Sequence, residues 1–97
     1  MAKLKPVHPG EILQEEFMKS LGVSQNRLAN DIGVPPRRIN EIVLGKRGIT
    51  ADTALRLGRY FGTSPQFWMN LQARYDLEIQ RDLIGNQLDK VRALSAA

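Results

Sequence analysis

Apolar residues recur at helical spacing in five successive segments of the chain, and helix-starting or helix-stopping residues bound each segment. No stretch shows the sustained alternation of polar and apolar positions that is typical of a strand. The pattern therefore predicts an all-α, five-helix bundle whose core covers about residues 8–80. The predicted helices are 8–21, 24–32, 36–43, 50–61 and 64 to about 80.

A tight turn joins the second and third predicted helices. Ser24 is a suitable N-cap for the first of them, and Gly33 after its end can adopt the left-handed conformation. Val34 can then fold back as an apolar plug under the turn, and Pro36 suits the first turn of the next helix. Two short helices joined in this way form a helix-turn-helix, here predicted over 24–44, which is the layout of a DNA reader.

The apolar stripes also identify a candidate core. His8, Thr50 and Ser64 are suitable N-caps for the first, fourth and fifth helices, and the apolar residues that recur after each cap would form the inner face of its helix. The predicted core residues are Ile12, Leu13, Phe17, Leu21, Leu28, Ala29, Ile32, Ile39, Ile42, Val43, Ala54, Leu55, Leu57, Gly58, Tyr60, Phe61, Phe67, Trp68, Leu71, Tyr75 and Leu77.

A further apolar stripe follows residue 80 at spacings of four, three and three residues, and it predicts a C-terminal helical extension over 81–97. Gly85 disfavours this helix. The stripe either packs on its own bundle or meets another chain. Residues 1–7 lack periodicity and are expected to form a flexible arm. The stripe consists of Ile84, Leu88, Val91 and Leu94.

The chain has 97 residues, of which 42% are hydrophobic, and this is enough for one domain without disulfides or a metal. It contains no Cys, which excludes disulfides and thiolate ligands. We find no apolar run long enough to span a membrane and no signal-peptide pattern. We therefore expect a cytoplasmic protein with a single domain, 1–97, and with no membrane contact, metal or cofactor.

Positive charge is concentrated in one part of the chain. The net charge is +4, and residues 37–47 carry four cations and one anion, whereas residues 51–97 carry six cations and five anions. The basic residues thus fall on the third predicted helix and the loop after it, where attraction to phosphate would be useful. An ordinary solvated helix face is the alternative, although such a face more often mixes both signs.

The run 24–60 resembles the lambda and 434 repressor class of helix-turn-helix domains. The pattern of that class has a Gln at the start of the motif's first helix, then a small residue, a Gly at the turn and an Ile in the next helix. The matching residues are Gln25, Ala29, Gly33 and Ile39.

A broader resemblance extends from about residue 6 to residue 80. The sequences VHPGEIL at 7–13, GVPPRRINEIVLGKRGITADTALRL at 33–57 and YFGTSPQFWMNLQARYDL at 60–77 are similar to the HigA group of antitoxins, also called VapI. In that group the antitoxin neutralises a HigB ribonuclease toxin of the RelE-like type and represses the shared operon as a dimer. The resemblance therefore implies three partners: operator DNA, a HigB-type toxin and a second copy of the chain.

The resemblance also implies roles for individual residues. Gln25 is expected to contact phosphate, and Arg37, Arg38 and Glu41 are expected to face base edges in the major groove. Asn40, Lys46 and Arg47 are expected to flank the DNA backbone. The complete predicted DNA-binding set is Gln25, Arg37, Arg38, Asn40, Glu41, Lys46 and Arg47.

Side-chain chemistry supports this division. Arginine can pair with guanine in a bidentate way and a carboxylate can accept from cytosine, each good pair giving about 1–3 kcal/mol of base discrimination. Lys46 and Arg47 are expected to add affinity without sequence preference. The chain departs from the repressor class at Pro35 and Pro36, where polar residues are usual. Base reading would therefore depend on the two arginines and Glu41.

Three other features allow both structural and functional interpretations. His8 is the only histidine, and a helix cap is favoured over a catalytic or metal-binding role. Glu15 and Glu16 point in different directions on a helix, so an acidic bias near the helix start explains them better than catalysis. The aromatic group of the fifth helix is compatible with core, with a dimer interface or with a stacking platform for single-stranded nucleic acid.

A palindromic operator requires a two-fold protein, because each half-site needs its own recognition helix. We expect dimerisation through residues 65–94, with Phe67, Trp68, Leu71 and Tyr75 as the candidate interface.

The leading functional hypothesis is an autoregulating antitoxin. The alternatives are a free-standing Xre-type transcriptional regulator without a toxin, and an interaction module that has lost DNA binding. An enzyme is disfavoured, because no P-loop, dinucleotide fingerprint, metal-ligand cluster or nucleophile-base pair is present.

Overall fold

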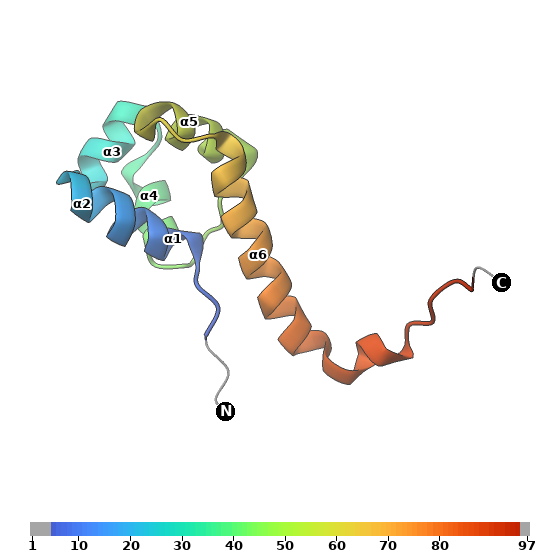
Figure 1. The fold of residues 1–97 in the computed structure, drawn as a ribbon. Coiled ribbons are helices and arrows are strands. Elements are labelled where there is room, and N and C mark those ends of the chain that lie inside the picture. Colours follow the sequence, from blue (N-terminus) through green and yellow to red (C-terminus); the bar gives the residue numbers. More distant parts are fainter. Residues whose placement is uncertain (1–4, 96–97) are drawn as a thin grey trace.

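The computed structural model describes residues 5–95, and over this range its regular elements are all helical. The first helix is continuous and contains one wider π-helical segment, η1, between α1 and α2. Four further helices and a short 3-10 segment follow (Figure 1), which confirms the predicted all-α, five-helix architecture. The elements are α1 (Pro9–Ile12), η1 (Leu13–Met18), α2 (Lys19–Leu21), α3 (Gln25–Ile32), α4 (Pro36–Val43), α5 (Ala51–Phe61), α6 (Pro65–Ile84) and η2 (Gly85–Lys90).

The predicted N-caps are confirmed by their hydrogen bonds. In each case a side-chain acceptor binds a backbone N–H of the first helical turn, which would otherwise lack a partner. The bonds run from Gly10 N to His8 Nδ1 (2.9 Å), from Arg27 N to Ser24 Oγ (3.1 Å), from Thr53 N to Thr50 Oγ1 (3.4 Å) and from Phe67 N to Ser64 Oγ (3.1 Å).

The predicted turn of the helix-turn-helix is also confirmed. Gly33 has a φ of 75°, a left-handed conformation that glycine adopts without steric cost. The N–H of Val34 then reaches back to the carbonyl of Ala29 at 3.0 Å, and the Val34 side chain is buried beneath the turn. Local chemistry therefore fixes the direction in which α4 leaves α3.

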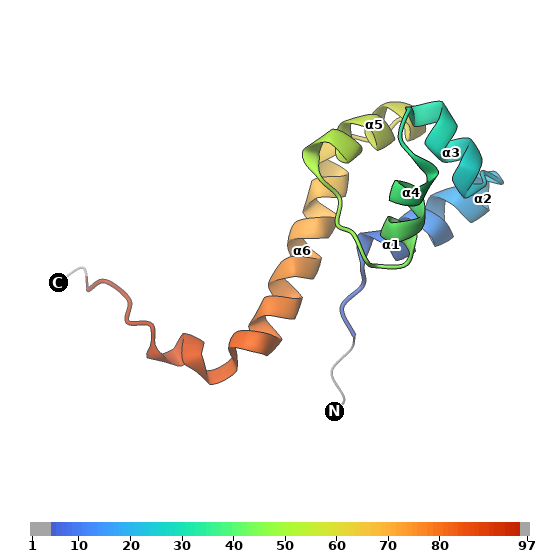
Figure 2. The ribbon, with the colours of Figure 1, turned by 180° about the vertical axis from the view of Figure 1, so that it is seen from behind.

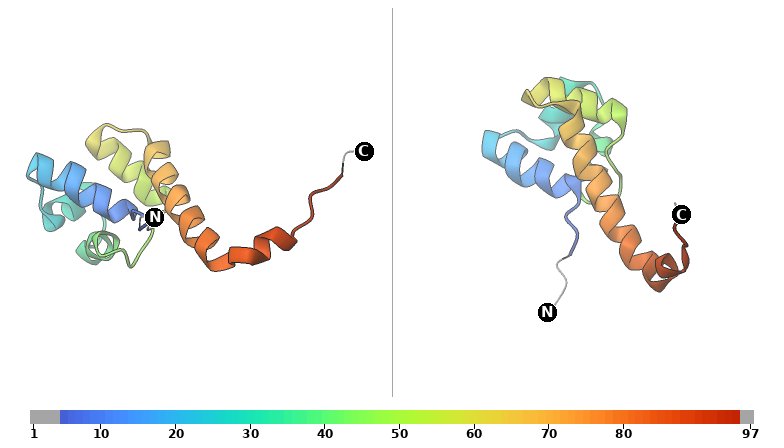
Figure 3. Two further views of the ribbon diagram at one scale, coloured as in Figure 1. Left: turned by 60° about the horizontal axis from the view of Figure 1, so that its bottom comes forward. Right: turned by 45° about the vertical axis from the view of Figure 1, so that its right-hand side comes forward.

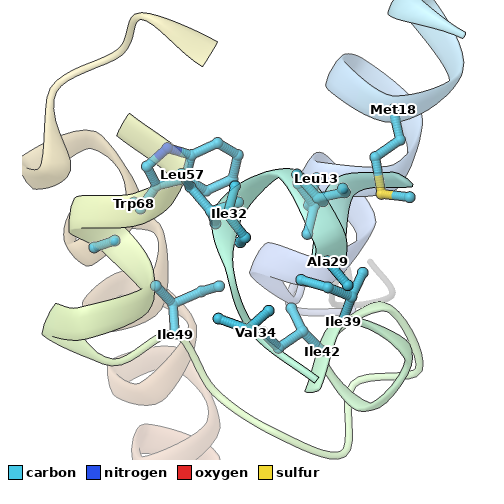
Figure 4. Packing of buried hydrophobic residues seen from close by; sticks show 12 residues of the cluster. Leu13, Met18, Ala29, Ile32, Val34, Ile39, Ile42, Ile49, Leu57 and Trp68 are labelled. Atoms are coloured by element: carbon cyan, nitrogen blue, oxygen red, sulfur yellow. The ribbon is translucent and has the colours of Figure 1, made fainter. Parts of the chain in front are cut away.

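The core is formed by one buried side-chain cluster between the five helices (Figure 4). The figure shows Leu57 and Trp68 on one side of this cluster and Leu13 on the other, with Ile32 of α3 between them and Ile39 and Ile42 of α4 below Leu13. The cluster consists of Leu13, Met18, Leu28, Ala29, Ile32, Val34, Ile39, Ile42, Ile49, Ala54, Leu57 and Trp68.

Several predicted core residues lie outside this cluster, and three of them are mostly exposed. Leu21 and Leu55 are each 61% exposed, and Leu77 is 55% exposed. In the first helix the N–H of Lys19 bonds to the carbonyl of Gln14, five residues back, so the inner stripe passes from Leu13 to Met18 and leaves Leu21 outside. In α5 the inner face is formed by residues 53, 54, 57 and 58, and Leu55 lies off that face.

A close backbone approach brings the first helix against α4. A Cβ built on Gly10 would lie 1.8 Å from the carbonyl oxygen of Ile42, so only glycine allows these helices to meet at this distance. Viewed from behind, α4 lies next to α1 and α3, and the following loop runs from its end to α5 (Figure 2). Gly10 of the HPG sequence thus allows α1 to pack closely against α4, the helix that carries the predicted base-reading residues.

The C-terminal segment agrees with the prediction only in part. Helix α6 leaves the bundle, and the chain bends after it (Figure 3). Gly85 has a φ of 51° and ends α6, so the segment continues as the short 3-10 helix η2 and then without helix over 91–95. The predicted helical extension thus reaches Lys90 but not the described residues after it, and Leu94 is 98% exposed. Parts of the predicted arm and tail, residues 1–4 and 96–97, lie outside the described residues.

Candidate nucleic-acid interface

Helix α4 separates into a buried face and an exposed face. Ile39 and Ile42 are fully buried, which fixes the roll of the helix in the bundle. The opposite face carries positions 37, 40, 41 and 44, which are neighbours at helical spacing. The side chain of Arg37 is 85% exposed. Exposed Leu44 shares this face, and the charge pattern gave no reason to include it among the predicted site residues.

Glu41 lies between Arg37 of this face and Arg47 of the loop after α4. Its Oε1 accepts from Nε and Nη2 of Arg47 at 3.0 and 2.8 Å, and its Oε2 lies 3.4 Å from Nε of Arg37. The hydrogen bonds from Arg47, followed by the charges of both arginines, lower the pKa of Glu41 below its ordinary value. Glu41 is thus a charged group that organises two cations, and its predicted contact with cytosine would require these bonds to exchange.

Gln25 and Asn40 come together although they are far apart in sequence. Nδ2 of Asn40 donates to Oε1 of Gln25 at 3.2 Å, which links the start of α3 to the exposed face of α4. These are two of the residues predicted to contact the DNA backbone. Their hydrogen bond places them at one edge of the group formed by Arg37, Glu41 and Arg47.

The basic loop after α4 is held at both ends. The N–H of Lys46 donates to the carbonyl of Glu41 at 2.8 Å, and Gly45 before it has a φ of 75°. At the far end the N–H of Ile49 donates to Oε1 of Gln72 at 2.7 Å. The loop therefore presents Lys46 and Arg47 beside α4 in a fixed backbone conformation.

Sequence reasoning missed two residues beside this face, Asp52 and Arg56. Oδ2 of Asp52 accepts from Nη1 of Arg38 and from Nε of Arg56, each at 3.0 Å. Nη1 of Arg56 donates in turn to the carbonyl of Ile32 at 2.7 Å, at the turn of the motif. Asp52 and Arg56 are four positions apart, but their contacts with Arg38 and with Ile32 span 14 and 24 positions, so no local sequence pattern could reveal that they reach the motif.

The four residues of α6 that were predicted to contact a second copy of the chain differ in their exposure. Trp68 is fully buried, and its Nε1 donates to Oγ1 of Thr63 at 2.8 Å, so the prediction of Trp68 as a subunit contact is wrong. Leu71 and Tyr75 are half-buried, and the Tyr75 ring lies edge-on to His8 with centroids 4.8 Å apart. Phe67 is 36% exposed. These three residues remain candidates.

His8 acts as a helix cap in this structure. Its Nδ1 accepts a hydrogen bond, and burial lowers the pKa of its imidazole, opposed in part by the nearby charges of Glu11 and Asp76. Within residues 5–95, no three His, Cys, Asp or Glu side chains are grouped so that they could hold a metal ion. Over the same range, no helix is long and apolar enough to cross a bilayer.

The short turn between α3 and α4, the buried stripe on α4 and its basic exposed face together define a helix-turn-helix domain of the DNA-binding class. A family model described as "Helix-turn-helix" matches residues 15–68. The chain is 56% identical over 77 residues to virulence-associated protein I of Dichelobacter nodosus, covering 79% of this chain and 71% of that protein. It therefore belongs to the Xre-type helix-turn-helix family, within the group of HigA antitoxins and virulence-associated protein I.

Solved structures support the same assignment. The Pseudomonas aeruginosa antitoxin HigA, determined with the higBA promoter, has a TM-score of 0.88 and 46% identity, with 93% of this chain and 99% of that chain covered. The antitoxin GraA in complex with its operator has a TM-score of 0.89 and 40% identity, with coverages of 99% and 98%. The family is a non-enzymatic class of DNA-binding antitoxins and regulators.

Proposed function

We propose that this protein is a cytoplasmic DNA-binding antitoxin that represses its own operon as a homodimer and neutralises a HigB-type, RelE-like ribonuclease toxin. The exposed face of α4 carries the proposal, because its arginines and the adjoining basic loop form one surface opposite the buried isoleucines. Relatives solved with promoter or operator DNA support the DNA-binding part. The names of those relatives support the antitoxin part.

In the proposed complex, the exposed face of α4 enters the major groove and Arg37, Arg38 and Glu41 provide base selection. Gln25 and Asn40 contact the DNA backbone together at one edge. Lys46 and Arg47 contribute attraction to phosphate, which does not depend on base sequence. Two copies would be needed for a palindromic operator, and Phe67, Leu71 and Tyr75 remain our candidates for the contact between them.

The first test compares three single variants on two duplexes, the promoter of the protein's own gene and a scrambled duplex of equal length. Lys46→Ala should weaken both duplexes alike and reduce the slope of log affinity against log salt by about 1. Arg37→Ala should cost about 1–3 kcal/mol on the promoter and much less on the scrambled duplex. Lys90→Ala, a control in η2, should change neither affinity. Equal losses on both duplexes for Arg37→Ala and Lys46→Ala would contradict the division of roles.

The antitoxin part needs a separate measurement. Co-expression with the product of the neighbouring gene should yield a complex that survives purification and suppresses that product's ribonuclease activity. Salt-sensitive promoter binding without such a partner would favour a free-standing Xre-type regulator. Absence of salt-sensitive promoter binding would instead favour an interaction module that has lost DNA binding.

A further inference from the structure

Two neighbouring arginines on the first turn of α4 differ sharply in their freedom. The side chain of Arg37 is 85% exposed, whereas that of Arg38 is 30% exposed. Arg38 is more restricted because its Nη1 donates to Oδ2 of Asp52 at 3.0 Å. The first turn of a recognition helix is the part that contacts base edges, so a fixed arginine there matters for recognition.

Asp52 is itself held from its other side. Nε of Arg56 donates to the same Oδ2 at 3.0 Å, and Nη1 of Arg56 is anchored 2.7 Å from the carbonyl of Ile32. The contacts thus run from the end of α3, through the first two turns of α5, to the first turn of α4. Asp52 stays ionised in this setting, because the hydrogen bond from Arg56 and then that from Arg38 lower its pKa.

We propose that Asp52 is a positioning residue for DNA recognition: it holds the guanidinium of Arg38 in place before a duplex arrives. This inference rests on the proposed function. The contact with Asp52 uses Nη1 of Arg38, and a guanidinium has five N–H donors in a planar fork, so the pair is compatible with a simultaneous contact to a guanine. Prior ordering reduces the conformational entropy that Arg38 loses on binding.

The same carboxylate has an opposing effect on affinity. Its negative charge lies beside the basic face and repels phosphate on any duplex. Removing the charge should therefore move two quantities in opposite directions. Binding to a scrambled duplex should tighten slightly, while the preference for the promoter over the scrambled duplex should fall.

The test measures this preference as the dissociation constant for the scrambled duplex divided by that for the promoter. It compares four proteins: the unaltered chain, Asp52→Asn, Arg38→Ala and the double variant. Asp52→Asn should lower the ratio by about 3- to 10-fold, the range expected when one long side chain loses its prior ordering. In the Arg38→Ala background, Asp52→Asn should change the ratio no further, because Asp52 acts through Arg38. Asp52→Ser also removes the carboxylate and suits a helix start, so it replaces Asp52→Asn in the test if that variant does not fold.

A matched control is Glu15→Gln, which removes a carboxylate from the Glu15–Lys19 pair at 2.9 Å on the first helix. It should leave the ratio unchanged. An unchanged or higher ratio in Asp52→Asn would overturn the inference, and so would an equal loss in the presence and absence of Arg38. Failure of the unaltered chain to bind its promoter in a salt-sensitive way would instead contradict the proposed function, so the two failures are distinguishable.

Discussion

The two halves of α6 carry similar apolar patterns but have opposite surroundings. In the first half Trp68 is fully buried among the aromatic rings of the bundle, whereas in the second half Leu77 and Leu83 are 55% and 70% exposed. The apolar pattern is a local property of the chain, whereas the burial of a residue depends on whether another helix packs against that part of α6. The difference shows that helical periodicity predicts the helix but not the surface that covers it.

The largest effect should come from truncating the buried half. Trp68→Ala removes a fully buried ring and the hydrogen bond to Thr63, and it should lower the free energy of unfolding by about 3–5 kcal/mol. The measurement is urea unfolding followed by circular dichroism. Since natural domains of this size are stable by about 5–15 kcal/mol, this variant should be near the limit of folding.

The matched change in the other half is Leu83→Ala, which should alter the unfolding free energy of a single chain by less than about 0.5 kcal/mol. A loss that appears at high protein concentration and shrinks as the protein is diluted would show that a second copy covers this half in solution. A large loss at every concentration would break the comparison, because Leu83 would then contribute to the core of its own chain.

The second effect concerns the glycines of the first helix. Gly10→Ala should destabilise by about 2–3 kcal/mol, because the added methyl would meet the Ile42 carbonyl and push α1 away from α4. Gly22→Ala is the matched control: its φ is +67° but the space around it is open, so only backbone strain of about 1 kcal/mol is expected. Equal thermal shifts for the two variants would contradict the close-approach interpretation.

Much of the fold could be predicted from the sequence because its controlling interactions are local. Ser24, Thr50 and Ser64 cap their helices through amides three positions away, and Gly33 turns the chain through its own φ. The errors arose where local rules compete with tertiary structure. The π-helical turn in the first helix changed which residues face inward, and Gly85 ended α6 before the apolar stripe ended.

The candidate site shows the same division. The sequence predicted the exposed arginines of α4, because the spacing of Ile39 and Ile42 defines the opposite face. It could not predict that Asp52 and Arg56 reach this face from α5. Trp68 was assigned both to core and to a dimer interface, and only the packing of α6 on α5 decides in favour of core.

The smallest effect should be a pH dependence at His8, where the bundle meets the middle of α6 through Tyr75. Burial lowers the pKa of His8 from 6.5, and Glu11 and Asp76 partly oppose this shift. The unfolded chain therefore binds a proton more readily than the native one, so this contribution to stability is complete above pH 6.5 and declines as the pH falls from there to the native pKa. Protonation also removes the Nδ1 acceptor that binds the N–H of Gly10.

His8→Asn retains a capping acceptor and removes the titration. Urea unfolding of both proteins between about pH 7.5 and about pH 5 should show the unaltered chain losing stability relative to His8→Asn as the pH falls. The carboxylates are common to both proteins, so the difference between the two profiles isolates the imidazole. Parallel profiles would contradict this prediction, because they would mean that the pKa of His8 is the same in the native and the unfolded chain.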